Sequence, residues 1–224
     1  MPKYGKTGLM LLVMVAASVA AISIAGAAAT NVTPAGDGLH MTSTNVSFAF
    51  GSSVIVCETG EAYGTIASPE ATDVPLSNPV FQNVGGGECT TTGTEGAKFK
   101  VVTSSTTERI FALSAISPTS AKLKFPGQPA GIEFISGSCI MKAFKADAPT
   151  GTWTNGESKS PYAISSTLKV VNGNFNLLNY EEVKKNPNCP PALVENIKKS
   201  VSGSLSATFV VSDYTHPAQA VLLK

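Results

Sequence analysis

The chain has 224 residues, of which 16 are basic and 15 are acidic, so its formal net charge at pH 7 is +1. Such a near-neutral chain lacks the basic face that binding to nucleic-acid phosphates requires, so we predict no nucleic-acid partner. Arg109 is its single arginine, which argues against an arginine-built clamp for phosphate or carboxylate groups.

The first 29 residues have the organisation of an export signal. Lys3 and Lys6 precede the apolar run Leu9–Ile24, and the small residues Ala25–Ala29 follow it. A basic start, an apolar middle and an Ala-x-Ala exit are typical of a secretory signal peptide. We therefore predict that residues 1–29 are a signal peptide and that the protein is extracytoplasmic. Because the apolar and small residues together are long enough to cross a bilayer, an uncleaved anchor is the alternative.

The segment 30–44 is polar and contains the turn residues Pro34–Gly38. We predict that it is a flexible N-terminal segment. A single domain is predicted to follow over residues 45–224, because one β-sandwich or barrel can occupy this length and no internal repeat is visible.

Four cysteines are spread along the predicted domain: Cys57, Cys89, Cys139 and Cys189. An even number of cysteines in an oxidising compartment predicts two disulfides. We favour Cys57–Cys89 and Cys139–Cys189, because sequential pairs enclose loops of moderate length; the other two pairings remain open. The cysteines lack the C-x2-C spacing of zinc sites, so no metal site is predicted.

The domain has β patterning over most of its length. Apolar and polar residues alternate with a period of two in several segments, and Gly, Pro and Asn clusters separate these segments. Clear examples are Phe48–Phe50, Phe99–Thr103, Lys122–Phe125, Ile132–Ile135 and Ser204–Val211, and the apolar run Val54–Val56 leads into Cys57. This pattern predicts an all-β antiparallel sandwich of the immunoglobulin-like or jelly-roll-like kind.

One short helix is expected near residues 191–199. It begins after Pro190, and Leu193, Val194 and Ile197 give it an apolar stripe. Glu195 near its start and two lysines at its end match the helix dipole.

The sequence does not contain a recognisable catalytic motif. His40 and His216 are the only histidines available to a Ser/His/Asp hydrolase, and no Gly-x-Ser-x-Gly elbow is present. Both histidines are interpreted as exposed residues near the ends of the domain, although a His216–Asp213 pair facing a serine would indicate an enzyme. Gly85–Gly87 lacks the Lys-Ser/Thr of a phosphate-binding loop, so no cofactor is predicted.

Two further groups of residues have a functional and a structural interpretation. A glycosidase needs two facing carboxylates, and no pattern distinguishes such a pair among Glu58, Glu61, Glu88, Glu133, Glu181 and Glu182. Trp153 could stack on a sugar or a lipid, but a packed strand residue before an Asn-Gly turn is the preferred interpretation.

Several short motifs together resemble a group of secreted, β-rich, mostly actinobacterial proteins of unknown role. Some of these proteins are labelled activators of alkane oxidation. The resembling motifs cover most of the predicted domain and are Ser53–Cys57, Pro79–Phe81 before Cys89, Ser136–Cys139, Thr150–Gly156, Cys189 with Leu193-Val194, and Ser204–Ser212. The chain departs from this group in having Ile110-Phe111 where an aromatic Pro-Trp element is common, and in its larger number of lysines. The resemblance implies an exported β-rich fold and no particular activity.

We therefore predict a secreted, non-catalytic structural or interaction protein of the cell envelope or extracellular space. Its partner would be itself or another envelope protein, and the segment Asn45–Phe50 could donate a strand to an open sheet edge. The alternative is an extracytoplasmic module that binds an apolar or lipid-like ligand. Its pocket would be lined by Phe99, Phe111, Phe125 and Phe134.

Overall fold

The structure is a computed structural model that describes residues 30–77, 79–94, 96–103, 111–124, 131–143, 149–199 and 202–224. The predicted signal peptide, Arg109 and Phe125 lie outside the described residues. Among the described residues, no helix is both long enough and apolar enough to cross a membrane.

The described chain consists mostly of antiparallel strands. The first strands are β1 (Val32–Thr33), β2 (Gly38–Ser43), β3 (Val46–Phe50), β4 (Ser53–Cys57), β5 (Thr59–Thr65), β6 (Asp73–Leu76), β7 (Val80–Gln82), β8 (Cys89–Thr92) and β9 (Lys98–Thr103). They are followed by β10 (Phe111–Ser117), β11 (Ser120–Lys124), β12 (Ile132–Ser136), β13 (Cys139–Ala143), β14 (Thr150–Thr154), β15 (Ser166–Asn176), β16 (Ser202–Asp213) and β17 (Leu222–Leu223). The helices are α1 (Tyr180–Lys185) and α2 (Pro191–Lys199).

Eight strands close into an antiparallel barrel, in the order β16-β15-β14-β11-β10-β6-β5-β2. The barrel closes because β2 also pairs with β16, with Thr42 opposite Val210 and Leu39 opposite Asp213. The all-β antiparallel prediction is confirmed, but a closed barrel replaces the predicted sandwich. Alternating residues indicate one buried face per strand, which both architectures share, whereas the pairing that closes the barrel joins distant segments.

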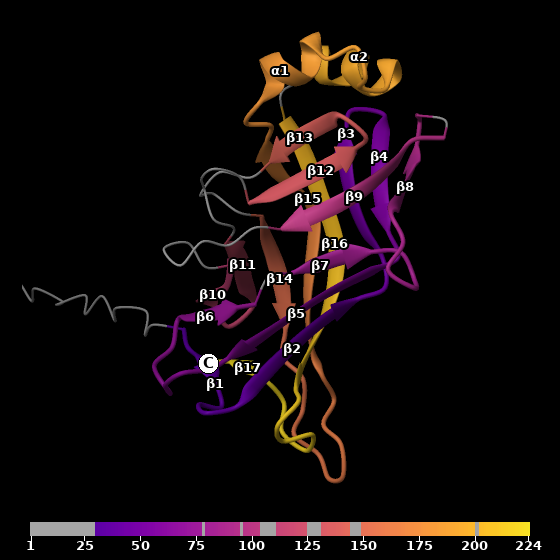
Figure 1. Cartoon of the computed structure of the whole chain (residues 1–224). Helices are drawn as coiled ribbons and strands as arrows, with labels where there is room; N and C mark the ends of the chain where they lie inside the picture. Colours follow the sequence, from indigo (N-terminus) through magenta and orange to yellow (C-terminus); the bar gives the residue numbers. More distant parts are fainter. Residues whose placement is uncertain are drawn as a thin grey trace, which may run out of the picture.

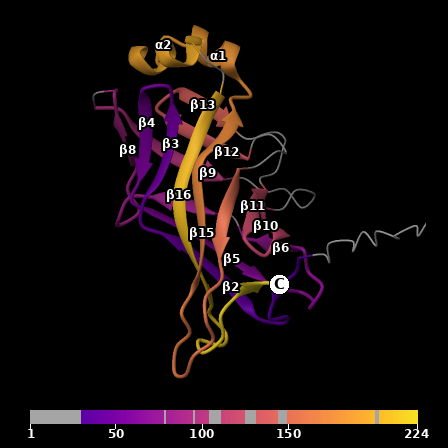
Figure 2. The ribbon, with the colours of Figure 1, turned by 180° about the vertical axis from the view of Figure 1, so that it is seen from behind.

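A second group of strands extends from the same central strand. The N-terminal part of β16 pairs with β3, and the sheet continues through β4, β8, β9, β12 and β13. Ala143, at the end of β13, forms a bridge with Leu177, just after β15. This half therefore curls back to β15 and β16, which run the length of the molecule through both halves (Figures 1 and 2).

A cluster of phenylalanines fills the second half. Phe48 and Phe50 project from the same face of β3, and both meet Phe134 of β12 edge-on, with ring centroids 4.9 and 5.5 Å away. Phe175 of β15 packs against Phe50 at 5.4 Å. All four rings are buried. Edge-to-face packing adds to the free energy of burying the rings, and here it joins three strands that are distant in sequence.

Two helices cover one end of this half (Figure 1). The predicted helix is α2, which buries Leu193, Val194 and Ile197 as expected. The sequence did not predict α1, because Val183 is its only buried residue and an apolar stripe is therefore missing. Asn179 before α1 accepts a hydrogen bond from the backbone N–H of Lys142 at 2.8 Å, which anchors this helix to β13.

The cysteines form the two predicted disulfides. Cys57 at the end of β4 is bonded to Cys89 at the start of β8. Cys139 at the start of β13 is bonded to Cys189 just before α2. The first bond joins adjacent segments of the sheet, and the second attaches the helical end to the sheet.

The N-terminal segment differs from the prediction. Residues 30–44 are not a flexible tail, because they contain β1, which pairs with β17, and β2, which closes the barrel. Leu39 and Met41 are buried, whereas His40 and Thr42 alternate with them on the outer face. Because turn residues precede Gly38 and the alternating segment is short, the sequence pattern did not predict this strand. Strand β3, within the segment proposed to be donated, pairs with β4 and β16 and has no free edge.

Replacing both Cys139 and Cys189 by alanine should lower the free energy of unfolding by about 4 kcal/mol. The bond closes a loop with a sequence separation of 50 residues, and its loss restores conformational entropy to the unfolded chain. Urea unfolding of the variant and the oxidised wild-type protein measures this difference. A loss below about 1 kcal/mol would contradict the stabilising role given to this bond.

Candidate functional site

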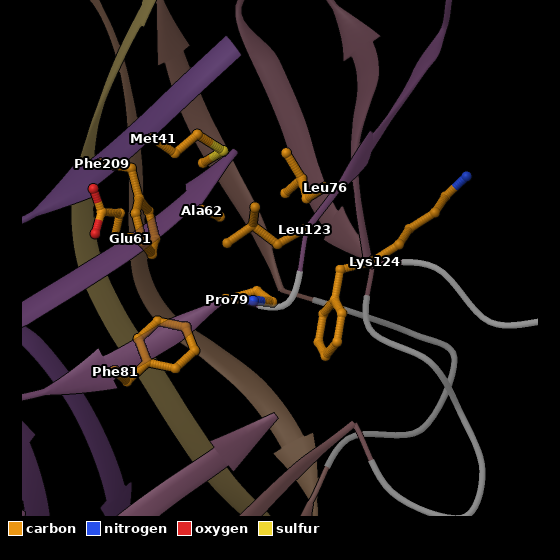
Figure 3. A pocket seen from close by; sticks show the side chains of 10 residues that line it. Met41, Glu61, Ala62, Leu76, Pro79, Phe81, Leu123, Lys124 and Phe209 are labelled. Atoms are coloured by element: carbon orange, nitrogen blue, oxygen red, sulfur yellow. The ribbon is translucent and has the colours of Figure 1, made fainter. Parts of the chain in front are cut away.

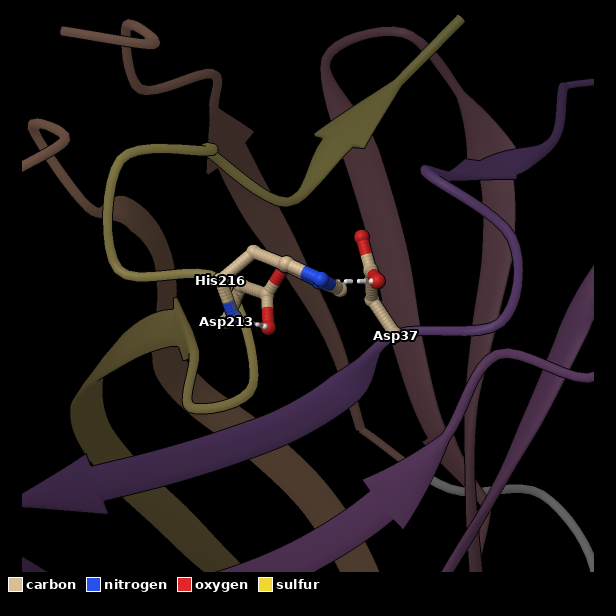
Figure 4. Close-up of side chains that lie close together, drawn as sticks. All are labelled: Asp37, Asp213 and His216. Carbon is tan, nitrogen blue, oxygen red and sulfur yellow. Dashed lines mark hydrogen bonds and ion pairs between the residues drawn. The ribbon is translucent and has the colours of Figure 1, made fainter. Parts of the chain in front are cut away.

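A group of ionisable side chains lies where the barrel closes. Asp37 precedes β2, Asp213 ends β16, and His216 lies in the loop that follows (Figure 4). Because β2 and β16 are antiparallel, the start of one lies beside the end of the other, with Leu39 opposite Asp213. The closure of the barrel therefore brings together residues from both ends of the described chain.

Asp213 is held by the turn that it begins. Its Oδ1 atom accepts hydrogen bonds from the backbone N–H of Thr215 at 2.8 Å, the Thr215 hydroxyl at 2.7 Å and the backbone N–H of His216 at 2.9 Å. Thr215 Oγ1 in turn accepts a bond from the Gly38 N–H at 2.9 Å. These bonds fix the carboxylate and tie the loop after β16 to the start of β2.

The second oxygen of Asp213 has no such partner. Its Oδ2 atom is buried and makes no hydrogen bond, and it lies 3.8 Å from Nδ1 of His216. The same Nδ1 atom lies 2.5 Å from Oδ1 of Asp37. The side chain of Asp37 is only 6% exposed, whereas that of His216 is 57% exposed. Two buried carboxylates thus share one imidazole that is open to solvent.

The environment of Asp37 raises the pKa of its carboxyl above the ordinary value of an aspartate. Burial raises the pKa of this carboxyl, and the nearby carboxylate of Asp213 raises it further. The hydrogen bond and positive charge of His216 oppose this rise without cancelling it.

The contacts of this cluster do not form a nucleophilic triad. His216 faces two carboxylates, and the hydroxyl of Thr215 beside them donates to Asp213. The Asp213–His216 spacing was visible in the sequence, where His216 was interpreted as an exposed residue or, if it faced a serine, as part of an enzyme site. Nothing in the sequence indicated Asp37. One donor atom from each of Asp37, Asp213 and His216 lies within 4.8 Å of the others, an arrangement that can hold a cation.

The second histidine belongs to a different cluster, on the outer face of β2 and β5. His40 Nε2 lies 2.7 Å from Glu61 Oε1, and the Tyr63 hydroxyl donates to the same oxygen at 2.7 Å. The His40 and Tyr63 rings are stacked, with centroids 4.3 Å apart. The hydrogen bonds from Tyr63 and His40 lower the pKa of Glu61. The three side chains therefore hold one another in place.

An uncharged, shallow groove adjoins this cluster. Tyr63 and Tyr214 pack edge to face with centroids 5.8 Å apart, and they are 42% and 50% exposed. Gly38 permits this arrangement, because a Cβ atom there would lie 2.3 Å from the Tyr214 ring. The groove is lined by Tyr63, Gly64, Thr65, Ala67, Pro75, Leu76, Ser77 and Tyr214.

The other candidate residues occupy ordinary structural positions. Trp153 is 1% exposed and donates to Asn155 Oδ1 at 2.7 Å, so the packed-strand interpretation is confirmed. Glu58 accepts a bond from the Val84 N–H, and Glu133 lies 3.8 Å from Lys142.

Described residues in the interior of the barrel line a small apolar cavity (Figure 3). Met41, Phe81, Leu123 and Phe209 are among its lining residues, and the centre of a water-sized sphere can occupy about 20 Å³ of it. This space holds roughly one water molecule. Of the phenylalanines expected to line a ligand pocket, Phe111 lines this cavity. Phe99 and Phe134 are buried in the core away from it.

Comparison of the chain with protein-family models, with curated proteins and with solved structures found no match. The resemblance to secreted actinobacterial proteins stays a prediction.

In protein freed of metal ions, the Asp213→Asn variant should be more stable at pH 7 than the wild type, by about 1 kcal/mol. The amide group introduced by this substitution can donate a hydrogen bond towards Asp37. In the wild type the same position holds Asp213 Oδ2, a buried acceptor without a partner. The pKa of Asp37 is raised by folding, so its contribution to stability is full below its ordinary pKa and is lost as pH rises through the folded value. The advantage of the variant should therefore shrink towards pH 4.

Urea unfolding at pH 4 and pH 7 measures this effect, with Glu61→Gln as the control. The pKa of Glu61 is lowered by folding, so its contribution is present above its ordinary pKa and is lost as pH falls. The control should thus lose stability at pH 7. An Asp213→Asn variant that also loses stability at pH 7 would contradict the account of the acid pair.

Proposed function

We propose that the protein is an exported, non-catalytic interaction protein of the cell envelope or extracellular space. The two disulfides among the described residues fit an oxidising compartment outside the cytosol. The predicted signal peptide at residues 1–29 gives the route of export. The barrel serves in this proposal as a rigid support for a binding surface.

The observation that carries the proposal is the uncharged groove with two exposed tyrosines. The centres of protein interfaces are depleted in charged residues and enriched in aromatic ones, and the lining of this groove has the same composition. Glu61 and His40 hold the Tyr63 ring, and Tyr214 rests on Gly38. Binding would therefore cost little side-chain entropy, because both rings are already positioned.

We propose a protein partner that contacts side chains of the groove. Strand addition through β3 is not favoured, because both edges of this strand are paired within the chain. The composition of the groove suits a second copy of this chain and another envelope protein equally. The experiment below distinguishes these two partners. An apolar ligand is the less favoured alternative, because the barrel cavity has room for roughly one water molecule.

The Tyr63→Ala/Tyr214→Ala double variant tests this function in the native host. We expect at least a tenfold loss of the envelope-bound fraction, because interface tyrosines often contribute more than 1 kcal/mol each. Tyr162→Ala is the matched control, since Tyr162 is 72% exposed and lies outside the groove. Quantitative immunoblotting of envelope and soluble extracellular fractions gives the measurement.

Thermal melting of the purified variants shows whether each has folded. Sedimentation of purified wild-type protein identifies self-association, which should be lost in the double variant if the partner is a second copy. An unchanged distribution of a folded double variant, together with unchanged sedimentation, would contradict the proposal.

A further inference from the structure

We propose that Asp37, Asp213 and His216 bind a divalent transition-metal ion of the Zn²⁺ or Mn²⁺ class at the point where the barrel closes. This site lies beside the groove of the proposed function, because Tyr214 of the groove directly follows Asp213 in the sequence, but none of the three proposed ligands lines the groove. It would be structural: the ion would fasten the turn before β2 to the loop after β16.

The unpartnered oxygen of Asp213 is the observation that points to a ligand. Three donors already occupy its Oδ1 atom, whereas Oδ2 is buried without any hydrogen bond. The side chain of Asp213 is 0% exposed, so water does not solvate this oxygen. A buried carboxylate oxygen without a partner is costly. A bound cation between Asp213 and Asp37 would satisfy this oxygen and balance the two negative charges.

The donor atoms are close to the arrangement that a metal ion needs. Nδ1 of His216 lies 2.5 Å from Asp37 Oδ1 and 3.8 Å from Asp213 Oδ2. Two ligands on one ion at bond lengths of about 2.1 Å stand roughly 3 to 4 Å apart. The distance from His216 Nδ1 to Asp37 Oδ1 must therefore increase, whereas the distance from His216 Nδ1 to Asp213 Oδ2 already fits. His216 can make this adjustment because its side chain is 57% exposed, while the turn keeps Asp213 in place.

The chemistry of the donors selects the class of ion. Imidazole nitrogen is a good ligand for Zn²⁺, and carboxylate oxygen suits both Zn²⁺ and Mn²⁺. Ca²⁺ takes six to eight oxygen ligands, which is more than the two carboxylates of this cluster readily supply. The exposed side of His216 leaves room for water at the remaining coordination positions.

Because of the position of the site, binding of a metal ion would stabilise the folded protein. His216 and Asp37 are separated by 179 positions in the sequence, and they lie on the two sides of the β2–β16 seam. An ion that binds this pair in the folded state, and only weakly in the unfolded chain, shifts the equilibrium towards the folded protein. Thermal stability should therefore rise with metal concentration.

Metal titration of the tag-free full chain tests the proposal, after chelator treatment and dialysis. We expect one equivalent of Zn²⁺ in competition with a chromophoric chelator, and one equivalent of Co²⁺ with visible absorption bands. Asp213→Asn and His216→Ala should each weaken Zn²⁺ binding at least 10-fold, and up to roughly 100-fold, because each removes one of three ligands. Zn²⁺ should raise the melting temperature of the wild type and leave that of both variants unchanged.

His40→Ala is the matched control, because His40 also lies 2.7 Å from a carboxylate but has no second carboxylate against it in the described residues. It should change the affinity for Zn²⁺ by less than twofold. His216→Ala removes an exposed side chain and keeps the test usable if Asp213→Asn does not fold. The proposal is overturned if the wild type binds none of Zn²⁺, Mn²⁺ and Co²⁺, which would leave a shared proton as the only partner of the acid pair. It is also overturned if His40→Ala, rather than the cluster variants, abolishes binding.

Discussion

The pairing of one long strand, β16, is the constraint on which the rest of the structure depends. One edge of β16 follows β15 along the molecule, and the other edge is divided between β3 and β2. Its buried and less buried residues alternate over nearly the whole strand, so that it contributes to the interior of both halves. Without the β2 pairing the barrel would be an open sheet, and without the β3 pairing the phenylalanine-filled half would lose its hydrogen-bonded connection to β16.

The same pairing creates the ionisable cluster. Asp37 and Asp213 are brought together because β2 and β16 run antiparallel and meet near their ends. The hydrogen bonds of Thr215 and His216 hold one carboxylate, and the fold buries the other. Two buried carboxylates beside one imidazole destabilise a protein unless a proton or a cation lies between them. At this seam, the pH and the metal-ion concentration of the solution can therefore change the stability of the fold.

The sequence predicted the local features of the fold better than the contacts between distant segments. Alternation identified several strands, among them β3, β9, β11, β12 and β16, but not β5, β6 or β8. The apolar stripe identified α2, and cysteine order identified the disulfides. Strand β2 was not predicted from the sequence, because Leu39 and Met41 follow turn residues and form too short an alternating run. It also missed Asp37, because an acidic residue in a polar turn is ordinary until the barrel closes around it. Barrel closure and the acid pair both depend on residues about 170 positions apart or more, which leave no local pattern.

Native-state hydrogen exchange of β2 tests barrel closure most directly. The amides of β2 that pair with β16 and β5 should exchange slowly, at rates close to those of the interior amides of β16, because they open only with the barrel. Exchange of residues 38–43 at the rate of an unstructured peptide, while β15 and β16 stay protected, would show that this segment is a free tail. That result would contradict the closed barrel and, with it, the cluster built at its seam.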